Sequence, residues 1–399
     1  FQAADVYALT SREDPFPSVV LEAMDAGLPV VAFEGAGGFV DLLRRGCGIA
    51  VPAFDTSAMA SGIEDLLDRP DYAAQMGRSG REIIEHEFHV RDYAYDLLKF
   101  AGRPLPRISV VVPNYNYARY LRDRLASITE QSVVPYELIV LDDASSDDSV
   151  EVIRDFLRQI PIPSTLVVND DNSGSVFKQW QRGVELARGD FVWIAEADDL
   201  ADADFLAELL PKFADPSVVL AFCQSRQMGD RGEILSNHYL DYVADIDSSR
   251  WTKSYTVGGD EEIATALHVK NTIPNVSAVV FRREVLQAVL SEYGEEIRSF
   301  RFAGDWVAYL RVLERGSIAF SPLSLNSHRR HASSVTVGNF NARQLREIIK
   351  VQREVVQRHA LGEAATQRAE AYADRLYHQF GLATPDMPRF QDNPEFKAH

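Results

Sequence analysis

The sequence predicts an α/β protein built on a Rossmann-like sheet of parallel strands. From residue 108 to residue 199, short apolar runs typical of buried strands alternate with amphipathic helical patterns. A polar cluster directly follows each of four of these runs. Ligands of such sheets bind beyond the carboxyl ends of the strands, so the clusters predict one ligand site at one edge of the sheet. The clusters are residues 114–116, 142–148, 169–175 and 196–199.

Composition places the chain among ordinary globular proteins. Its 399 residues suffice for two or three domains at about 150 residues each, and 46% hydrophobic against 25% charged residues excludes a wholly disordered chain. The formal net charge of −18 opposes phosphate backbones, which argues against nucleic acid as a partner. The same charge opposes a nucleotide ligand unless a cation intervenes.

Cysteine content and hydropathy bear on the cellular location. Cys47 and Cys223 are far apart in the sequence, so neither a disulfide framework nor a cysteine zinc site is expected. A reducing, cytoplasmic setting fits this content. No apolar run approaches the roughly 18 residues that cross a bilayer. Because residue 1 is Phe and no signal peptide is visible, we expect the chain to begin inside a larger protein.

Residues 1–102 show a short β/α pattern of the parallel-sheet type. Strands are expected at residues 4–9 and 29–33, with a helix at 18–27 that Gly27 stops. A second helix is expected at 57–70, with Asp55, Thr56 or Ser57 as its cap and Pro70 at its end. Two or three strands make a thin sheet. Residues 102–107 are then expected to form a linker.

A new α/β unit starts directly after the linker. Strands are expected at residues 108–113, 136–142, 164–170 and 190–199, and helices at 117–131, 149–160 and 176–189. After about residue 225 the pattern becomes mixed. Helix returns at 341–380, with one apolar stripe formed by Leu345, Ile348, Ile349, Val355 and Val356.

Six sequence pieces in this second unit point to a known family. They are SVVVPNYN (109–116), LIVLDDASSDDS (138–149), NSGSVFKQW (172–180), GDFVWIAEADD (189–199), GDW (304–306) and RRHASSVT (329–336). In this order, they make residues 107–335 resemble family 2 glycosyltransferases, which have the nucleotide-sugar-binding GT-A fold. The resemblance implies a metal-dependent, inverting hexosyltransferase. Its donor would be a UDP- or dTDP-sugar, and its acceptor a saccharide or lipid-linked saccharide in surface polysaccharide synthesis.

The resemblance assigns the donor-binding side chains. Asp143 would accept the N3–H of uracil or thymine, with Asp142 beside it, while Pro113 and Tyr115 lie against the base. Lys178 would face the base or the phosphates. The aspartates and Lys178 also have a structural explanation: the Asp-rich turn can cap the helix that follows, and Lys178 can be a surface lysine.

The acidic piece EADD (196–199) resembles the family's metal motif, in which hard oxygen ligands hold Mg²⁺ or Mn²⁺. The resemblance makes Asp199 the direct ligand and places Asp198 at the ribose or behind the ligand. Glu196 stands where the family more often has Asp. His331 matches a late His that helps to hold the metal or the diphosphate, and His328 lies three residues before it. A solvated acidic loop and a structural His are the alternatives.

Asp305, in the piece GDW, matches the family's catalytic base. Inverting transfer needs one carboxylate that removes the proton of the acceptor hydroxyl, whereas a glycosidase needs two. Because Asp305 precedes the apolar run WVAYLRVL, it is also a candidate helix N-cap.

Residues 1–102 resemble part of another family. The stretches 11–32 and 35–55 are similar to the C-terminal half of family 4, GT-B-type glycosyltransferases. Asp14 and Glu22 stand for that family's pair of glutamates, and Pro17 replaces its usual Gly. The upstream strands and the acceptor domain of that family are missing. We therefore expect residues 1–102 to be an inactive partial unit, residues 103–338 the catalytic domain, and residues 339–399 a helical extension.

Other functions and locations stay open at this stage. Both units could be degenerate and serve as a scaffold or binding protein. Nucleotidyl transfer is less well matched, because no Gly-rich basic loop follows the strand at 108–113. Residues 341–358 carry a local charge of 5 − 2 = +3, compatible with peripheral association at the inner membrane face. The alternative is a helix that packs on the catalytic domain. The oligomeric state is not predicted.

Overall fold

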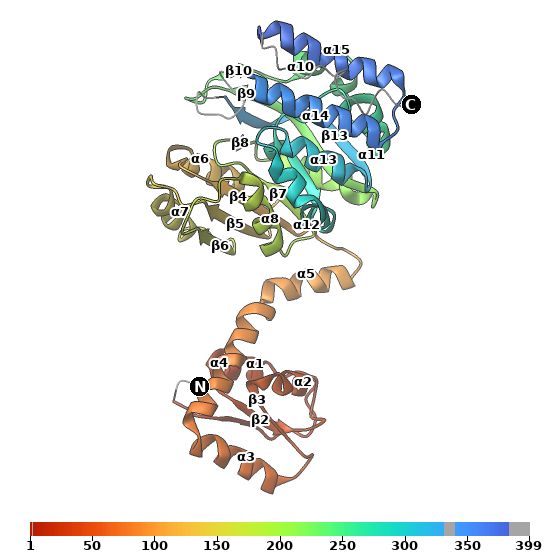
Figure 1. Cartoon of the computed structure of the whole chain (residues 1–399). Coiled ribbons are helices and arrows are strands. Elements are labelled where there is room, and N and C mark those ends of the chain that lie inside the picture. Colours follow the sequence, from red (N-terminus) through yellow and green to blue (C-terminus); the bar gives the residue numbers. More distant parts are fainter. Residues whose placement is uncertain (2, 331–339, 383–399) are drawn as a thin grey trace. The chain divides into compact units, whose positions relative to one another are not determined.

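The computed structural model describes residues 1, 3–330 and 340–382, and the chain divides into two compact units (Figure 1). The first unit is Phe1–Leu105 and the second is Pro106–His399. Each unit has a sheet and a hydrophobic core of its own. Among the described residues, no helix combines the length and the apolar character needed to cross a membrane.

The first unit contains a three-stranded parallel sheet in the order β1-β2-β3. Its strands are β1 (Tyr7–Leu9), β2 (Val30–Phe33) and β3 (Gly48–Val51). Its helices are α1 (Ser18–Asp25), α2 (Val40–Leu42), α3 (Thr56–Asp68), α4 (Pro70–Glu87) and α5 (Val90–Phe100). The predicted β/α pattern is confirmed, but the sequence analysis does not predict α4 and α5.

Two local signals around α3 explain its ends. Asp55 caps the helix, because its carboxylate accepts hydrogen bonds from the N–H groups of Ser57 and Ala58. Pro70 lies just beyond the end of α3 and is also the first residue of α4. Proline suits that position because the first helical N–H has no partner within the helix.

The second unit is built on a ten-stranded sheet in the order β11-β13-β9-β12-β7-β4-β5-β6, with β10 on β9 and β8 on β13. The strands β7, β4, β5 and β6 are parallel, as the sequence predicts. These four strands are β4 (Ile108–Asn114), β5 (Glu137–Asp142), β6 (Ser164–Val168) and β7 (Phe191–Ile194).

The rest of the sheet is mixed, which explains the irregular sequence pattern after residue 225. β12 pairs antiparallel with both β7 and β9, whereas β13 runs parallel to β9. These strands are β8 (Leu200–Ala201), β9 (Val218–Met228), β10 (Ile234–Ser236), β11 (Tyr255–Gly258), β12 (Val279–Arg282) and β13 (Ser317–Arg329).

Helices cover both faces of this sheet. Alternate residues of β4 enter different hydrophobic clusters: Val110 and Val112 lie in one, and Val111 in the other. The helices are α6 (Ala118–Thr129), α7 (Ser149–Leu157), α8 (Val176–Leu186), α9 (Phe205–Leu209), α10 (Leu240–Val243), α11 (Gly259–Glu262), α12 (Arg283–Ser299) and α13 (Gly304–Leu313). The predicted fold class is confirmed.

The C-terminal helices α14 (Ala342–Arg358) and α15 (Glu363–Gln379) form a pair that packs on the second unit (Figure 1). Val351 and Val355 of α14 enter the main core of this unit. Leu345 and Ile349 pack instead against Tyr372 of α15. The predicted apolar stripe of α14 is therefore covered by protein, as expected of a helix that packs on the catalytic domain.

Helix α8 lies so close to β4 at Gly183 that a larger residue there should destabilise the second unit. A Cβ atom at Gly183 would lie 2.2 Å from Cγ1 of Val111. We expect Gly183→Ala to push α8 off β4 and to lower the free energy of unfolding by about 1–3 kcal/mol. Urea denaturation followed by tryptophan fluorescence measures this, because all four tryptophans lie in the second unit.

The control for this test is Leu186→Ala on the same helix. Leu186 is 41% exposed, so its truncation should change stability by no more than about 0.5 kcal/mol. Equal urea midpoints for the two variants would contradict close packing at Gly183.

Candidate active site

The carboxyl ends of β4 and β5 are joined by side-chain hydrogen bonds. Asn114 at the end of β4 donates from Nδ2 to Oδ2 of Asp142 at the end of β5, at 2.7 Å. The same Oδ2 accepts the Ser145 hydroxyl at 2.7 Å, and Oδ1 accepts the Ser145 N–H at 2.9 Å. Asp142 is fully buried. In this structure it closes the turn after β5.

Asp143 receives hydrogen bonds from the segment after β6 and from α8. Its Oδ1 accepts from Asn169 Nδ2 at 2.7 Å, from the Ser173 N–H at 2.9 Å and from Gln179 Nε2 at 2.8 Å. Its Oδ2 accepts the Ser173 hydroxyl at 2.8 Å. Three of the four predicted polar clusters, at 114–116, 142–148 and 169–175, therefore meet at one edge of the sheet.

The other predicted donor-binding residues lie around this edge. Pro113 is buried within β4, and Tyr115, two residues later, is 47% exposed. Lys178 is exposed on the first turn of α8, and its Nζ donates to the carbonyl of Ser173 at 2.9 Å. Tyr115 and Lys178 thus lie at the accessible side of the edge that Asp143 and Ser173 form.

The acidic motif follows β7 and concentrates negative charge in a buried place. Burial, together with the charges of Asp198 and Asp199, raises the pKa of Glu196 to about 8. Burial also raises the pKa of Asp199, whose two oxygens accept from Asn275 Nδ2 and from the Arg329 N–H, both at 2.8 Å. Asp198 is the partly exposed member of the carboxylate pair.

One buried cation lies near the acidic motif. The guanidinium of Arg124, on α6, lies 4.9 Å from the ring of Trp193 and is fully buried. Burial lowers its pKa to about 10, while Asp199, Asp198 and Glu196 raise it. Within the described residues, its three nitrogens have no hydrogen-bond acceptor. Arg124 thus offsets part of the negative charge of the motif.

His328 is the described histidine that interacts with Asp199 of the motif. His331, predicted as a metal ligand, lies outside the described residues. His328 shares a hydrogen bond of 2.7 Å between its Nδ1 and the Tyr239 hydroxyl. No group of three or more His, Cys, Asp or Glu side chains in residues 3–330 and 340–382 is arranged to hold a metal ion.

Asp305 lies in the first turn of α13, where a carboxylate interacts favourably with the helix dipole. The N-cap of this helix is Ala303, so the alternative that Asp305 is the N-cap is wrong. Asp305 Oδ2 accepts from Asn271 Nδ2 at 3.1 Å, and Oδ1 accepts the Trp306 N–H at 2.7 Å. Burial raises the pKa of Asp305 to about 6, although both hydrogen bonds favour the ionised form.

A single loop, residues 271–275, joins Asp305 to the acidic motif. Its first residue, Asn271, donates to Asp305, and its last, Asn275, donates to Asp199. Neither asparagine is predicted from the sequence as a site residue. The sequence feature that could have pointed to them is the presence of these two amide side chains in one short segment, directly before the apolar stretch 276–281.

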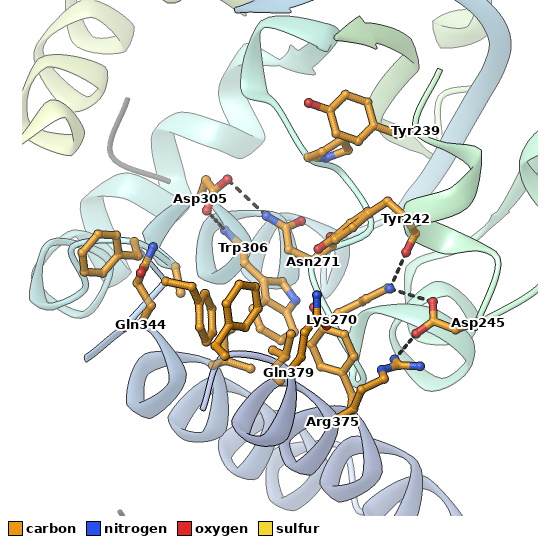
Figure 2. A pocket seen from close by; sticks show the side chains of 18 of the residues that line it. Tyr239, Tyr242, Asp245, Lys270, Asn271, Asp305, Trp306, Gln344, Arg375 and Gln379 are labelled. Atoms are coloured by element: carbon orange, nitrogen blue, oxygen red, sulfur yellow. Dashed lines mark hydrogen bonds and ion pairs between the residues drawn. The ribbon is translucent and has the colours of Figure 1, made fainter. Parts of the chain in front are cut away.

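Asp305 also lines a cavity of about 570 Å³ in the second unit (Figure 2). Loop 271–275, the end of β13 and both C-terminal helices contribute to its walls. Its lining includes many aromatic side chains, namely Tyr239, Tyr242, Phe302, Trp306, Phe340, Tyr372 and Phe380.

A parallel half-sheet with polar side chains at its carboxyl edge, a mixed half, and a carboxyl group at a cavity define the GT-A class of glycosyltransferase domains. Comparisons with known proteins give the families. Residues 109–290 match the family model "Glycosyl transferase family 2", and residues 1–83 match "Glycosyl transferases group 1". The second unit therefore carries a family 2 glycosyltransferase segment, and the first unit carries a group 1 segment of the GT-B type.

Individual relatives are distant. An uncharacterized protein of Mycobacterium tuberculosis, MT1568, is 28% identical over 233 residues, which cover 58% of this chain and 69% of the relative. Glycosyltransferase GlyG of Streptococcus pneumoniae is 23% identical over 253 residues, 61% of this chain and 77% of that protein. Putative teichuronic acid biosynthesis glycosyltransferase TuaG of Bacillus subtilis is 23% identical over 215 residues, 54% of this chain and 75% of that protein.

A solved structure shares the fold. The crystal structure of S. aureus TarS 1–349 in complex with UDP-GlcNAc superposes with a TM-score of 0.50 at 16% identity. The match covers 68% of this chain and 73% of the TarS chain. It agrees with the GT-A-like arrangement of the second unit.

The hydrogen bonds to Asp143 give a test of the site's architecture. Gln179→Glu replaces a donating amide with a carboxyl group of the same shape. We expect it to lower the free energy of unfolding by about 3 kcal/mol at pH 8, because two buried carboxylates then face each other. Near pH 4.5 the loss should shrink, because a protonated Glu donates again. Urea titrations at both pH values measure this.

The matched control is Lys178→Gln. It also makes the chain more negative by one charge, but at the exposed residue directly before Gln179. Its effect should be small and independent of pH. A pH-independent loss in Gln179→Glu would show that the variant acts through packing and not through Asp143.

Proposed function

We propose that the second unit is a metal-dependent, inverting glycosyltransferase that moves a sugar from a UDP- or dTDP-sugar to a saccharide or glycolipid acceptor in surface polysaccharide synthesis. The family 2 match supports the enzyme class. The names of TuaG, a putative teichuronic acid biosynthesis enzyme, and of the TarS complex with UDP-GlcNAc support the donor and the pathway. We further propose residues 103–338 as the catalytic domain and residues 339–399 as its extension.

The observation that carries this proposal is the state of Asp305. Its carboxyl group lines the cavity, is oriented by Asn271, and has a pKa near 6. A general base works best when its pKa lies near the working pH, because it is then both ionised and basic enough. Asp305 would take the proton of an acceptor hydroxyl as its oxygen attacks C1 of the donor sugar. The bond from C1 to the diphosphate breaks on the opposite side, which inverts the configuration.

Donor binding is proposed for the edge formed by β4, β5 and the segment after β6. Tyr115 offers an exposed aromatic ring, and Asp143 Oδ2 accepts only one protein hydrogen bond in the described structure. One further donor, such as the N3–H of uracil or thymine, can bind that oxygen. Pro113 forms the buried floor next to Tyr115, and Lys178 adds positive charge at the rim.

Metal binding is proposed for the acidic motif. Carboxylate oxygens suit Mg²⁺ or Mn²⁺, which proteins often hold with one or two carboxylates and substrate phosphates. The negative charges of Glu196, Asp198 and Asp199 repel one another, and a divalent cation would relieve this repulsion. We propose Asp199 as the direct ligand, with Asp198 at the ribose or behind the ligand, because the two oxygens of Asp199, which accept from Asn275 and Arg329, still have lone pairs for a cation. The bound cation would stabilise the charge of the leaving diphosphate.

The group 1 segment in residues 1–102 is proposed to be inactive. It has Asp14 where that family has the first of its two glutamates, and Pro17 where Gly is usual. A fold alone does not confer activity. Sugar transfer is therefore assigned to the second unit.

The direct test of the base is Asp305→Asn. The amide keeps the shape but cannot accept a proton, so kcat should fall by about 10²–10⁴-fold. Release of nucleoside diphosphate from a panel of UDP- and dTDP-sugars, with saccharide acceptors and Mn²⁺ or Mg²⁺ present, measures the rate. Full turnover by Asp305→Asn would remove Asp305 from this role.

Calorimetry with UDP and Mn²⁺ provides the controls. Asp305→Asn should bind UDP with Mn²⁺ as the unchanged protein does, whereas Asp199→Ala should lose the Mn²⁺-dependent part. Asp204→Ala, which removes an exposed carboxylate a few residues further on, should bind normally. Absence of UDP binding in the unchanged protein would favour the scaffold alternative.

The pKa of Asp305 predicts the pH dependence of transfer. The base must be ionised, so kcat/KM should fall about tenfold per pH unit below pH 6 and level off above it. In Asn271→Ala the ionised form loses a hydrogen-bond donor, so the pKa rises and the profile moves to higher pH. Profiles of both proteins with one active donor measure the shift. Superimposable profiles would show that Asn271 does not tune the base.

A further inference from the structure

We propose that the cavity beside Asp305 is an acceptor subsite for an uncharged saccharide, and that the C-terminal helix α15 forms one of its walls. This inference rests on the proposed function and names the substrate class of the same site. The family model ends at residue 290, so α14 and α15 lie outside the matched region.

The cavity connects the base to α15. Asp305 and Asn271 line it on the side of α13 and loop 271–275, and Arg375 and Gln379 line it from α15 (Figure 2). His328, at the end of β13, lines it as well. The next residue of β13, Arg329, holds Asp199 through its N–H. A molecule in this cavity therefore lies beside the base and α15, and the strand that holds Asp199 forms part of the wall.

Contacts through Asp245 and Lys270 connect helix α15 to loop 271–275, which orients the base. Arg375 forms an ion pair with Asp245, and Asp245 also binds Lys270 at 2.6 Å. The ammonium of Lys270 lies 4.3 Å from the ring of Tyr242 and 4.9 Å from the ring of Tyr372. The position of α15 is thereby tied to the residue directly before Asn271.

Tyr242 completes this connection from the other side of the loop. Its hydroxyl donates to the carbonyl of Asn271 at 2.9 Å, and the Asn271 side chain donates to Asp305. An acceptor that contacts α15 and Tyr242 would thus be held by residues that also orient the base through Asn271. Such shared support places an acceptor hydroxyl reproducibly next to a catalytic group.

The chemistry of the walls suits a sugar chain better than a lipid tail. Flat aromatic rings can pack against the C–H faces of pyranose rings. Amide side chains in the same lining, those of Asn271, Gln344 and Gln379, can bind hydroxyl groups. A lipid-binding cavity would need continuous apolar walls, whereas polar groups interrupt these ones.

The balance of charge favours an uncharged sugar over an acidic one. Three aspartates line the cavity, and three basic residues oppose them, a formal sum of zero with His328 neutral. Two of the three cations, Lys270 and Arg375, are already paired with one carboxylate, Asp245. A uronic acid or phosphate would need an excess of positive charge that this lining lacks. The charged lining residues are Asp241, Asp245, Asp305, Lys270, Arg330 and Arg375.

Saturation-transfer NMR on the whole chain tests this directly. The probes are four neutral tetrasaccharides (maltotetraose, cellotetraose, chitotetraose and mannotetraose) and one acidic tetrasaccharide from hyaluronan. We expect at least one neutral probe to bind, and more tightly than the acidic one. Arg375→Ala, which releases α15 from Asp245, and Gln379→Trp, which fills the cavity from an exposed position, should each weaken that binding at least tenfold.

Two matched variants on the same helix serve as controls. Arg368→Ala and His378→Trp make the same changes at exposed positions that do not line the cavity, and both should bind like the unchanged chain. Binding of no neutral probe, tighter binding of the acidic probe, or equal binding by all four variants would overturn the proposal.

UDP titration with Mn²⁺ separates this proposal from the proposed function. If UDP binds but no neutral saccharide does, the acceptor subsite is wrong and the transferase proposal stands. If a neutral saccharide binds and is lost in Arg375→Ala and Gln379→Trp, but UDP does not bind, the cavity is a saccharide site and the transferase proposal fails.

Discussion

The site depends on the hydrogen bonds that two asparagines of one loop give to two buried carboxyl groups. Asn275 donates to Asp199 and Asn271 donates to Asp305. Burying a carboxyl group costs free energy unless hydrogen bonds compensate for the lost water. Loop 271–275 provides this compensation at both places, so its conformation sets the distance between the acidic motif and the base.

Helix α14 also supports the base, because it contacts α13, the helix that carries Asp305. Glu347 of α14 accepts the N–H groups of Arg301, Phe302 and Ala303, directly before α13 begins. Arg311 of α13 is almost fully buried and binds Glu296 of α12 and Glu354 of α14. Removing one member of such a network leaves a buried charge uncompensated. The helix that carries Asp305 is thus fixed at both ends by groups far apart in the sequence.

Local patterns predict the first half of the second unit well. Each strand of β4 to β7 is an apolar run followed by a polar cluster, and this signal lies within about ten residues. The Asp143 network follows from the meeting of these strand ends. The contacts of loop 271–275 could not be predicted in this way, because Asn275 and Asp199 are 76 positions apart and Asn271 and Asp305 are 34 apart. A pair of amides in a loop has no periodicity, and only the mixed half of the sheet brings it to the carboxylates.

The distribution of charge differs between the acidic motif and the cavity beside Asp305. The net charge of −18 opposes a nucleotide ligand in general. At the acidic motif this opposition persists, because three carboxyl groups, those of Glu196, Asp198 and Asp199, interact with the buried cation Arg124. A divalent cation reverses the local sign and makes the motif attractive to a diphosphate. In the cavity, by contrast, the three basic residues Lys270, Arg330 and Arg375 equal the lining aspartates in number. A charged donor with its cation and an uncharged acceptor are therefore the pair of substrates that this arrangement of charge favours.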